Sequence, residues 1–267
     1  TLITEPDGTI IGPTVLFTAS PDDTTYRQNV LQKDFQYCYT IEAMDTINNF
    51  SSISNTVCIQ AEVPRQSDQL YISSVSNDFT RKSLDIDVYI DGKADVRSFQ
   101  IQRAPEYFGP YRTIATIGKP TAPPYIITFQ DFGVQADKFD YFYRVTATDS
   151  CGGYDTISNI SRNMRLNVKG EPDLTNRLTW TSYQGWGGYV EKYEIYRRAE
   201  GDFNYVKVGE NVNVNGGDDT TYTDYEIADL VAADPDAGAY CYYVKAIEGG
   251  NPQGIIDNFG NPMNAFS

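Results

Sequence analysis

The stretch Tyr37-Cys38-Tyr39-Thr40-Ile41-Glu42-Ala43 recurs twice in this chain, as Tyr141-Phe142-Tyr143-Arg144-Val145-Thr146-Ala147 and as Tyr240-Cys241-Tyr242-Tyr243-Val244-Lys245-Ala246. Every second residue of each copy is apolar, which predicts a β-strand with one buried face. The copies recur at a period of roughly 100 residues, which is the size of a small β-sandwich domain. The sequence therefore predicts an all-β chain of similar domains in a row.

The strands that flank these copies place the domain boundaries. We expect residues 1–62 to form the C-terminal part of a module, with strands at 9–17 and 24–30. A complete sandwich needs about seven strands, so this first module should lack two or three of them. Residues 63–163 should form a complete module, and residues 164–267 a module that lacks its last strand, because the chain stops before that strand could finish. The junctions between modules are short and hold no Gly/Ser tract, which predicts a semi-rigid rod.

The composition excludes several classes of partner. The chain has 36 acidic and 21 basic residues and a net charge of −15, with no basic stripe, so we expect neither nucleic acid nor an anionic membrane surface as a partner. No apolar run approaches the ~20 residues that span a bilayer, so we expect no direct membrane insertion. The acidity favours solubility, with cation binding as the alternative.

The 4 cysteines indicate an oxidising, extracytoplasmic compartment, because they lie on hairpins and not in CxxC or Cys/His clusters. Cys38 and Cys58 flank a turn-rich stretch, and adjacent antiparallel strands would bring them within bonding reach. We expect a disulfide between them, with two buried thiols as the alternative. Cys241 takes the place of Cys38 in the last module, and we expect its partner beyond the chain end. Cys151 has no obvious partner, and its state stays open.

The three recurring stretches and the strands around them resemble fibronectin type III modules. Trp180 matches the core tryptophan of that family's second strand and Tyr193 the aromatic residue of its third, whereas Val88 or Tyr89 stands in the tryptophan's place in the middle module. The resemblance implies tandem immunoglobulin-like β-sandwiches and leaves the function open, since one sandwich serves many tasks. It also implies a tyrosine corner, whose hydroxyl bonds to backbone at the sheet edge, at Tyr37, Tyr141 and Tyr240.

A narrower resemblance concerns the cysteine-bearing strands and the turn Asp149-Ser150-Cys151-Gly152. They are similar to repeats in large Bacteroidetes surface proteins, which include gliding-motility adhesins and other substrates of the type IX secretion system. Such bacteria glycosylate Ser or Thr in Asp-Ser/Thr-aliphatic or Asp-Ser/Thr-Thr triplets. The resemblance therefore implies O-glycosylation in two pairs of equivalent turns, at Thr46 and Thr156 and at Thr24 and Thr220. The alternative is that Asp-Thr pairs simply make stable turns.

The chain contains few residue patterns that are typical of catalytic or metal-binding sites. It contains no histidine, which excludes Ser-His and Cys-His nucleophile pairs and histidine-based zinc sites. No pair of carboxylates stands out as a glycosidase pair, so we expect no enzyme. We expect no cofactor, with calcium as the one candidate, because hard cations bind several carboxylate oxygens at once. The candidate ligands are Asp85, Asp87, Asp91 and Asp95, and a solvated strand face is the alternative.

A glycine-rich loop, Tyr183-Gln184-Gly185-Trp186-Gly187-Gly188-Tyr189, follows the Trp180 strand. If exposed, Trp186 and Tyr189 would offer aromatic rings to a sugar or to a partner protein. The alternative is that the indole folds back over its own module.

The sequence thus favours a non-catalytic segment of a large secreted cell-surface protein, acting as a semi-rigid stalk or adhesin spacer. We expect an extracellular location, on the outer surface of a bacterium. The expected partners are other domains of the same long chain, with a surface polysaccharide or a secretion or motility protein as further candidates. Two alternatives are an accessory or glycan-binding region of a secreted polysaccharide-degrading enzyme, and a docking surface for a secretion or motility partner.

Overall fold

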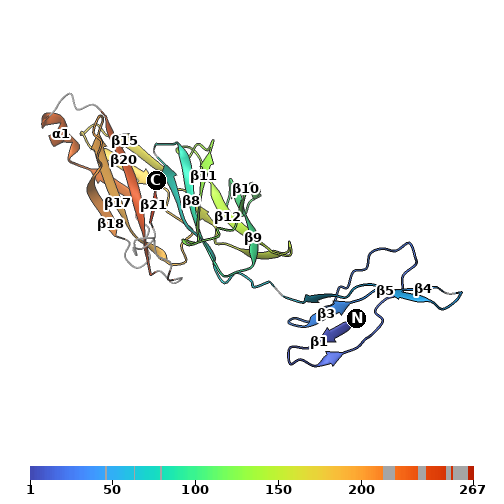
Figure 1. The fold of residues 1–267 in the computed structure, drawn as a ribbon. Coiled ribbons are helices and arrows are strands. Elements are labelled where there is room, and N and C mark those ends of the chain that lie inside the picture. The colour runs from blue at the N-terminus through green and yellow to red at the C-terminus, as the bar shows by residue number, and fades with distance from the viewer. Residues whose placement is uncertain are drawn as a thin grey trace. The chain divides into compact units, whose positions relative to one another are not determined.

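The computed structural model describes residues 1–45, 47–62, 64–78, 80–212, 220–233, 239–250, 254 and 264–267. The chain divides into two compact units, unit 1 (Thr1–Pro64) and unit 2 (Arg65–Ser267) (Figure 1). β-Strands make up almost all of the regular structure in both units.

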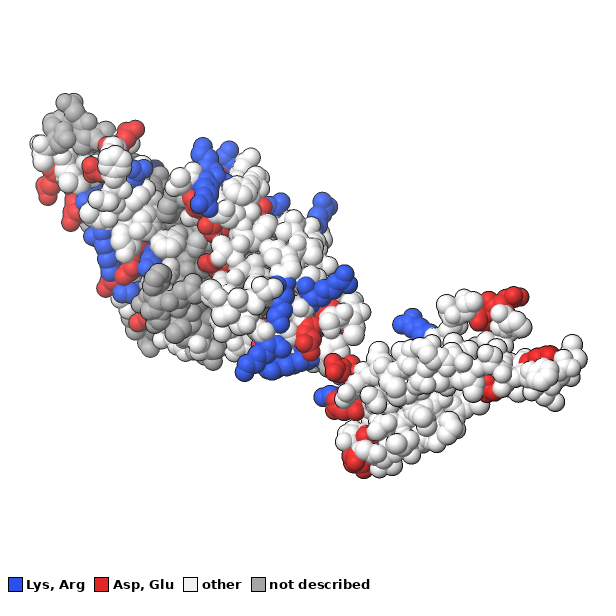
Figure 2. All heavy atoms as spheres, viewed as in Figure 1, with Lys and Arg blue, Asp and Glu red and all other residues white. Residues whose placement is uncertain are grey.

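Unit 1 is a single layer of strands. Its antiparallel sheet has the order β2-β1-β3-β6, and a separate hairpin pairs β4 with β5. The bounds are β1 Leu2–Thr4, β2 Ile10–Ile11, β3 Gln36–Tyr39, β4 Glu42–Met44, β5 Ser51–Ile53 and β6 Val57–Gln60. Tyr37 is the only buried apolar residue among those described in this unit. The face of unit 1 seen in Figure 2 is mostly uncharged, as expected for a sheet without a second layer.

The prediction of a strand at 24–30 is wrong, because these residues form no regular structure. Of the predicted strand at 9–17, only Ile10–Ile11 forms one. In unit 2 the equivalent Asp-Thr-Thr-Tyr segment leads into β19 (Thr221–Asp224), which pairs with β16 (Asn176–Trp180). Unit 1 has no counterpart of β16 among its described residues. A strand needs partners for its backbone amides and carbonyls, so residues 24–30 stay irregular.

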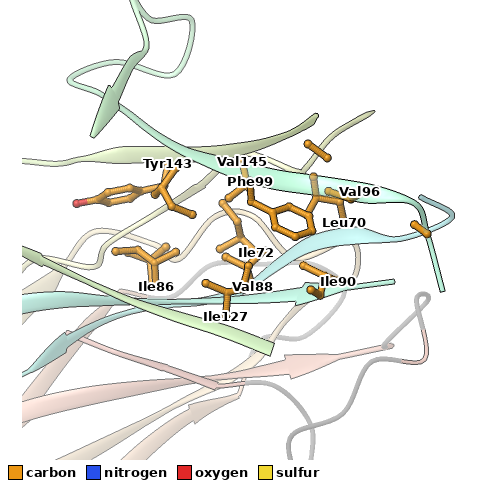
Figure 3. Packing of buried hydrophobic residues seen from close by; sticks show 14 of the residues in the cluster. Leu70, Ile72, Ile86, Val88, Ile90, Val96, Phe99, Ile127, Tyr143 and Val145 are labelled. Carbon is orange, nitrogen blue, oxygen red and sulfur yellow. The ribbon is translucent and has the colours of Figure 1, made fainter. Parts of the chain in front are cut away.

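Unit 2 contains two β-sandwiches, and we refer to the first as the middle sandwich. Its sheet β11-β8-β7 packs on the sheet β10-β9-β12-β13, and β14 also pairs with β12. The strands are β7 Leu70–Asp78, β8 Ser83–Ile90, β9 Val96–Ala104, β10 Arg112–Gly118, β11 Ile126–Phe132, β12 Phe142–Asp149, β13 Tyr154–Ile157 and β14 Ser161–Arg162. Alternate residues of both sheets meet in one core, where Ile72, Val88, Phe99 and Val145 are completely buried (Figure 3).

The C-terminal sandwich repeats this plan, with the sheet β15-β16-β19 against the sheet β18-β17-β20-β21. The further elements are β15 Leu166–Gly170, β17 Tyr189–Ala199, β18 Val206–Val212, α1 Ile227–Ala233, β20 Tyr240–Gly249 and β21 Asn264–Phe266. We expected this module to lack its last strand. Instead β21 pairs antiparallel with β20, with Ala265 opposite Ala246, and forms the first part of the edge strand, as β13 does in the middle sandwich. No described helix is long and apolar enough to cross a membrane.

The strand register shows which residue takes the place of Trp180 in the middle sandwich. Trp180 lies opposite Leu166 in the C-terminal sandwich, and Val88 lies opposite Ile72 at the same place in the middle one. Trp180 packs edge-on against Tyr193, with ring centroids 5.3 Å apart. In the middle sandwich a completely buried valine takes the position of the indole, and Phe99, which lies opposite Ala147 as Tyr193 lies opposite Ala246, takes the position of the tyrosine.

Candidate functional site

The two sandwiches of unit 2 share hydrophobic core. Tyr71 lies on β7 of the middle sandwich, yet its ring packs in the core cluster of the C-terminal sandwich with Met164, Trp180 and Trp186. Tyr71 is only 7% exposed. Because burial of a large side chain contributes roughly 2 to 3 kcal/mol, this contact ties the two sandwiches together. We refer to the contact of β7 with the loop 183–188 and β21 as the joint.

Hydrogen bonds across the joint come from the glycine-rich loop. The Trp186 indole Nε1 donates to the Ser73 carbonyl oxygen over 2.8 Å, and the Val75 amide donates to the Tyr183 hydroxyl over 3.1 Å. In each bond the donor and the acceptor belong to different sandwiches. A buried polar group costs free energy when it is unpaired, so opening the joint would expose apolar surface and break these bonds at the same time.

Two further hydrogen bonds extend the joint to the loop's end and to β21. The Gly187 amide donates to the Tyr71 hydroxyl over 2.7 Å, and the Phe266 amide donates to the Ser76 hydroxyl over 3.2 Å. β7 therefore contacts two separate segments of the C-terminal sandwich. Contacts at several points along one strand resist both bending and twisting of the joint.

Trp186 is buried, and it lies on the neighbouring sandwich and not only over its own module, which was the alternative to an exposed ring. Its side chain is 9% exposed because the loop folds onto β7. Gly185 permits this path: its φ is +132°, and a Cβ there would overlap the Ser161 side chain. Tyr189, the other proposed binding residue, keeps 52% of its surface exposed.

A cavity of about 800 Å³ lies beside the joint, lined by aromatic, amide and aliphatic residues that include Tyr71, Tyr107, Asn159, Gln184 and Trp186. No carboxylate, lysine, arginine or cysteine lines it. Burial raises the pKa of Tyr71 to about 12, so this hydroxyl stays protonated near neutral pH. The cavity therefore lacks the paired acid and base that hydrolytic chemistry needs.

An Arg–Asp–Tyr cluster around a buried aspartate lies in each sandwich, and it was not expected from the sequence. In the C-terminal sandwich the Arg197 guanidinium donates to the Asp224 carboxylate over 2.6 Å, and the Tyr242 hydroxyl donates to it over 2.9 Å. In unit 1 the equivalent Tyr39 hydroxyl donates to the neutral Gln28 over 2.8 Å. The donor is the second tyrosine of each recurring Tyr-x-Tyr stretch, which is the signal that could have found it. In the middle sandwich the Arg103 guanidinium donates to the Asp131 carboxylate over 2.6 Å, and the Tyr143 hydroxyl donates to it over 2.7 Å.

The first tyrosine of the recurring stretch binds backbone in two copies. The Gln32 amide donates to the Tyr37 hydroxyl over 2.8 Å, and the Gln135 amide donates to the Tyr141 hydroxyl over 3.2 Å. These bonds have the geometry that the resemblance to a tyrosine corner implies. For Tyr240, the residues at the matching distance before it, 234–235, lie outside the described part of the chain.

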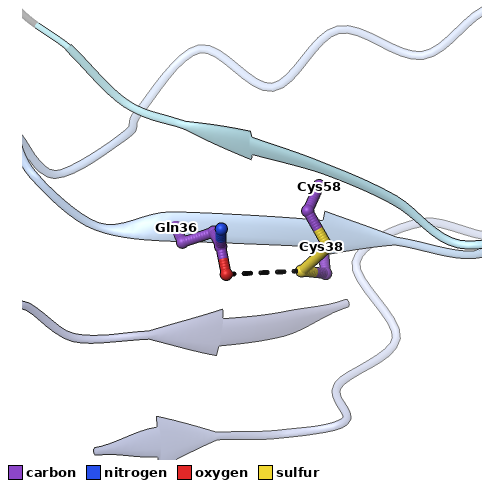
Figure 4. Close-up of a disulfide and its surroundings, with 3 residues drawn as sticks. All are labelled: Gln36, Cys38 and Cys58. Atoms are coloured by element: carbon purple, nitrogen blue, oxygen red, sulfur yellow. Dashed lines mark hydrogen bonds between the residues drawn. A yellow bond between two sulfur atoms is a disulfide. The ribbon is translucent and has the colours of Figure 1, made fainter. Parts of the chain in front are cut away.

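Cys38 and Cys58 lie opposite each other on β3 and β6 and form a disulfide with an S–S distance of 2.03 Å (Figure 4). Cys151 is a free, exposed thiol, and Cys241 is a free, half-buried thiol. Unit 1 buries little apolar surface. The disulfide is therefore a main source of its stability, because the cross-link lowers the conformational entropy of the unfolded chain.

Removing this cross-link should destabilise unit 1 selectively. For the double variant Cys38→Ser and Cys58→Ser we expect a loss of roughly 3 kcal/mol in unit 1, because the bridge closes a loop of about 20 residues. Hydrogen exchange measured by mass spectrometry should show faster exchange in β3 and β6 and no change in unit 2. Unchanged exchange in β3 and β6 would contradict the expectation.

A serine fixes the register of the last strand in all three copies. The amides of Ile41, Val145 and Val244 donate to the hydroxyls of Ser54, Ser158 and Ser267 over 2.9, 2.8 and 2.9 Å. Four positions after this serine, Cys58 lies opposite Cys38 and Arg162 lies opposite Phe142. Cys241 occupies the position of Cys38 and Phe142 in the C-terminal sandwich.

This register predicts where a partner for Cys241 would have to lie. We expect a chain extended beyond Ser267 by four residues, the last of them a cysteine, to form a disulfide with Cys241. An extension with the cysteine one position earlier is the control, because a shift of one residue turns the side chain to the other face. Peptide mapping without reduction distinguishes the two, and equal cross-linking in both would contradict the register.

The four carboxylates proposed for calcium do not converge. Each accepts a hydrogen bond from within its own sandwich: the donors are Gln130 and Thr128 side chains for Asp85 and Asp87, and the Lys93 and Arg65 amides for Asp91 and Asp95. Within the described part of the chain, no group of three or more His, Cys, Asp or Glu residues could hold a metal ion. Asp85 and Asp87 lie on β8, whereas Asp91 and Asp95 lie between β8 and β9.

The proposed glycosylation residues do not occupy equivalent turns. The Asp45 and Asp149 carboxylates each accept a hydrogen bond from the amide two residues on, over 2.9 Å. Asp149-Ser150 is therefore the counterpart of Asp45-Thr46, whereas Thr156 lies within β13. Thr46 itself lies outside the described residues. The remaining candidates are an exposed and a half-buried residue, Thr24 and Thr220.

Comparison with known proteins gives similar folds and no family assignment. No protein-family model matches the chain, and no curated protein matches it. It is similar to a Fn3-like protein from Clostridium thermocellum, at 23% identity over 37% of this chain and 90% of that one, with a TM-score of 0.28. It is also similar to the FN1–FN3 domains of chicken CNTN1, at 14% identity over 81% and 73%, with a TM-score of 0.27.

A third similar structure is a tetra-tandem repeat in the extending region of a large adhesion protein, at 12% identity. The match covers 100% of this chain and 64% of that one, with a TM-score of 0.27. The present chain thus spans less than two thirds of that structure. The assignment of tandem fibronectin type III-like sandwiches rests on the strand order and register of the chain itself.

Proposed function

We propose that this chain is a non-catalytic spacer segment of a large secreted cell-surface protein, and that the joint gives it stiffness. The observation that carries the proposal is the place of Tyr71, which belongs to one sandwich and lies in the core of the next. Domains joined by a free linker would each keep a separate core. A shared core instead couples their orientations, as a spacer requires.

We further propose that the protein acts on the outer surface of a bacterium, as an adhesin segment of the kind exported by the type IX system. A disulfide in unit 1 supports an oxidising compartment. The proposed partners are neighbouring domains of the same long chain, with a surface polysaccharide or a motility protein as the object of adhesion. The alternative of a glycan-binding region loses its main residue, because Trp186 is buried in the joint.

Spin-label distances in the full chain test the stiffness. One label goes on Cys151 in the middle sandwich and one on a cysteine that replaces the exposed Lys169, with Cys241→Ser to remove the second thiol. We expect a single narrow distance distribution, because the joint holds the two sandwiches in one orientation. A broad distribution in this variant would overturn the proposal.

Peptide mass mapping of the protein from its native source tests the location. We expect a Cys38–Cys58 linked peptide without reduction, and sugar mass on peptides that hold Thr46 or Thr24. Reduced cysteines throughout would remove the cell-surface proposal and leave the stiffness measurement unaffected.

A further inference from the structure

One carboxylate beside the joint has no charged partner among the described residues. Glu248 lies in β20 and is 2% exposed, no described side chain donates a hydrogen bond to either of its carboxylate oxygens, and the only described donor close to it is the Gly188 backbone amide. No other acidic side chain in the described part of the chain is buried in this way. Buried polar groups in native proteins are nearly always fully paired, so a buried carboxylate without a charged partner at this place needs a physical explanation.

The groups that face Glu248 come from both sandwiches. Its backbone lies opposite Val190 of β17. Its side chain is near Tyr71 of β7, near Tyr183 and near the Gly188 amide of the glycine-rich loop. No lysine or arginine is among the groups that act on it. The carboxyl therefore lies close to the same two tyrosines that hold the joint closed.

The ionised form of Glu248 is unfavourable in the closed joint. An ionised carboxylate that is buried without a cation or sufficient donors costs several kcal/mol, and such a group binds a proton instead. Burial raises the pKa of Glu248 to about 7. Burial also raises the pKa of Tyr71 to about 12 and raises that of Tyr183. Both tyrosines stay neutral, so Glu248 is the group at the joint that changes charge near neutral pH.

We propose that Glu248 makes the joint a proton-controlled contact, which is closed while the carboxyl holds its proton and loosens when the proton leaves. The inference rests on the joint alone and does not depend on the proposed cell-surface role. If both hold, the stiffness of the spacer is set by the pH around it.

The direction of the effect follows from proton binding. Between the ordinary carboxyl value of 4.5 and about 7, the closed joint holds a proton that an open, hydrated joint releases. The closed state is therefore favoured at the acid end, loses stability as the pH rises through this window, and changes little above it. The opening equilibrium should rise on the order of 50-fold between pH 5 and pH 8, since each pKa unit corresponds to a factor of ten.

Amide exchange across the joint tests the proposal in the full chain. The amides of Val75, Gly187 and Phe266 each donate to an acceptor in the opposite sandwich, so their exchange by NMR reports opening once it is corrected for intrinsic rates. We expect their protection to fall on the order of 50-fold from pH 5 to pH 8. In a Glu248→Gln variant it should stay nearly constant. Glu191→Gln, an exposed neutralisation on the adjacent β17, should behave as the unmodified chain does.

Two results would overturn the proposal. One is constant protection in the unmodified chain, and the other is an unchanged pH dependence in the Glu248→Gln variant. Should that variant fold poorly, the carboxyl carbon of Glu248 can be titrated by NMR in the unmodified chain. A midpoint near 7 supports the proposal, and a midpoint near the ordinary value of 4.5 refutes it.

Discussion

Replacing Trp186 with alanine should lower the free energy of unfolding of unit 2 by about 3 to 5 kcal/mol, which is the usual cost of truncating a buried tryptophan. The indole is 9% exposed, packs on Tyr183 with ring centroids 4.2 Å apart and donates to the Ser73 carbonyl. Its loss leaves a cavity at the joint and an unpaired carbonyl on β7. The middle sandwich keeps its own core, so we expect the joint to loosen before either sandwich unfolds.

Thermal unfolding and the spin-label distances measure the two parts of this effect. We expect a drop in the melting midpoint of roughly 10 °C and a broader distance distribution between the two sandwiches. Trp186→Phe should lose the hydrogen bond and retain most of the packing, at a cost of about 1 kcal/mol. Tyr189→Ala is the matched control, because that ring is exposed at the end of the same loop. Equal effects of Trp186→Ala and Tyr189→Ala would show that the indole does not hold the joint.

Replacing Asp224 with alanine should destabilise the C-terminal sandwich by about 3 to 5 kcal/mol, because it removes one partner of a buried ion pair. Asp224 is 1% exposed and accepts from both Arg197 and Tyr242. Without it the Arg197 guanidinium, which is itself buried, keeps only Glu226 as a charged partner among the described residues. The Tyr242 hydroxyl loses an acceptor as well.

The middle sandwich supplies the comparison for this prediction. Asp131→Ala breaks the equivalent pair, but the Arg103 side chain is 30% exposed against 8% for Arg197, so water can solvate the charge that is left. We therefore expect Asp131→Ala to lose less unfolding free energy than Asp224→Ala. The difference should be at least about 1 kcal/mol, which is the usual net contribution of one hydrogen bond. Chemical denaturation of both variants measures the difference. A larger loss for Asp131→Ala would contradict the account.

The fold was predictable from the sequence because the signal is local. Period-two alternation in the Tyr-x-Tyr stretches indicates strands whatever lies opposite them, and their spacing of roughly 100 residues indicates repeated domains. The disulfide between Cys38 and Cys58 was predictable for the same reason, since both cysteines flank one hairpin. The prediction of a strand at 24–30 was wrong because pairing partners, and not alternation, decide whether a segment becomes a strand.

The site was much less predictable. Asp85 and Asp87 were candidate cation ligands, with a solvated strand face as the alternative, and in the structure they accept hydrogen bonds from Gln130 and Thr128 of β11. Trp186 was expected to be exposed or to fold over its own module, but the acceptor of its indole, Ser73, lies 113 residues earlier in the chain. No local pattern distinguishes a loop that reaches solvent from one that lies on the next domain.

By itself, the sequence determined the strand alternation, the number of repeats and the cysteine pair, because each depends on neighbours along the chain. Only the tertiary structure decided that two sandwiches share a core, that Arg197 and Asp224 meet, and that Glu248 is buried without a charged partner in the described part of the chain. These features depend on the free energy of groups brought together across the fold, where burial removes water from a charge or a ring that a linear pattern leaves exposed.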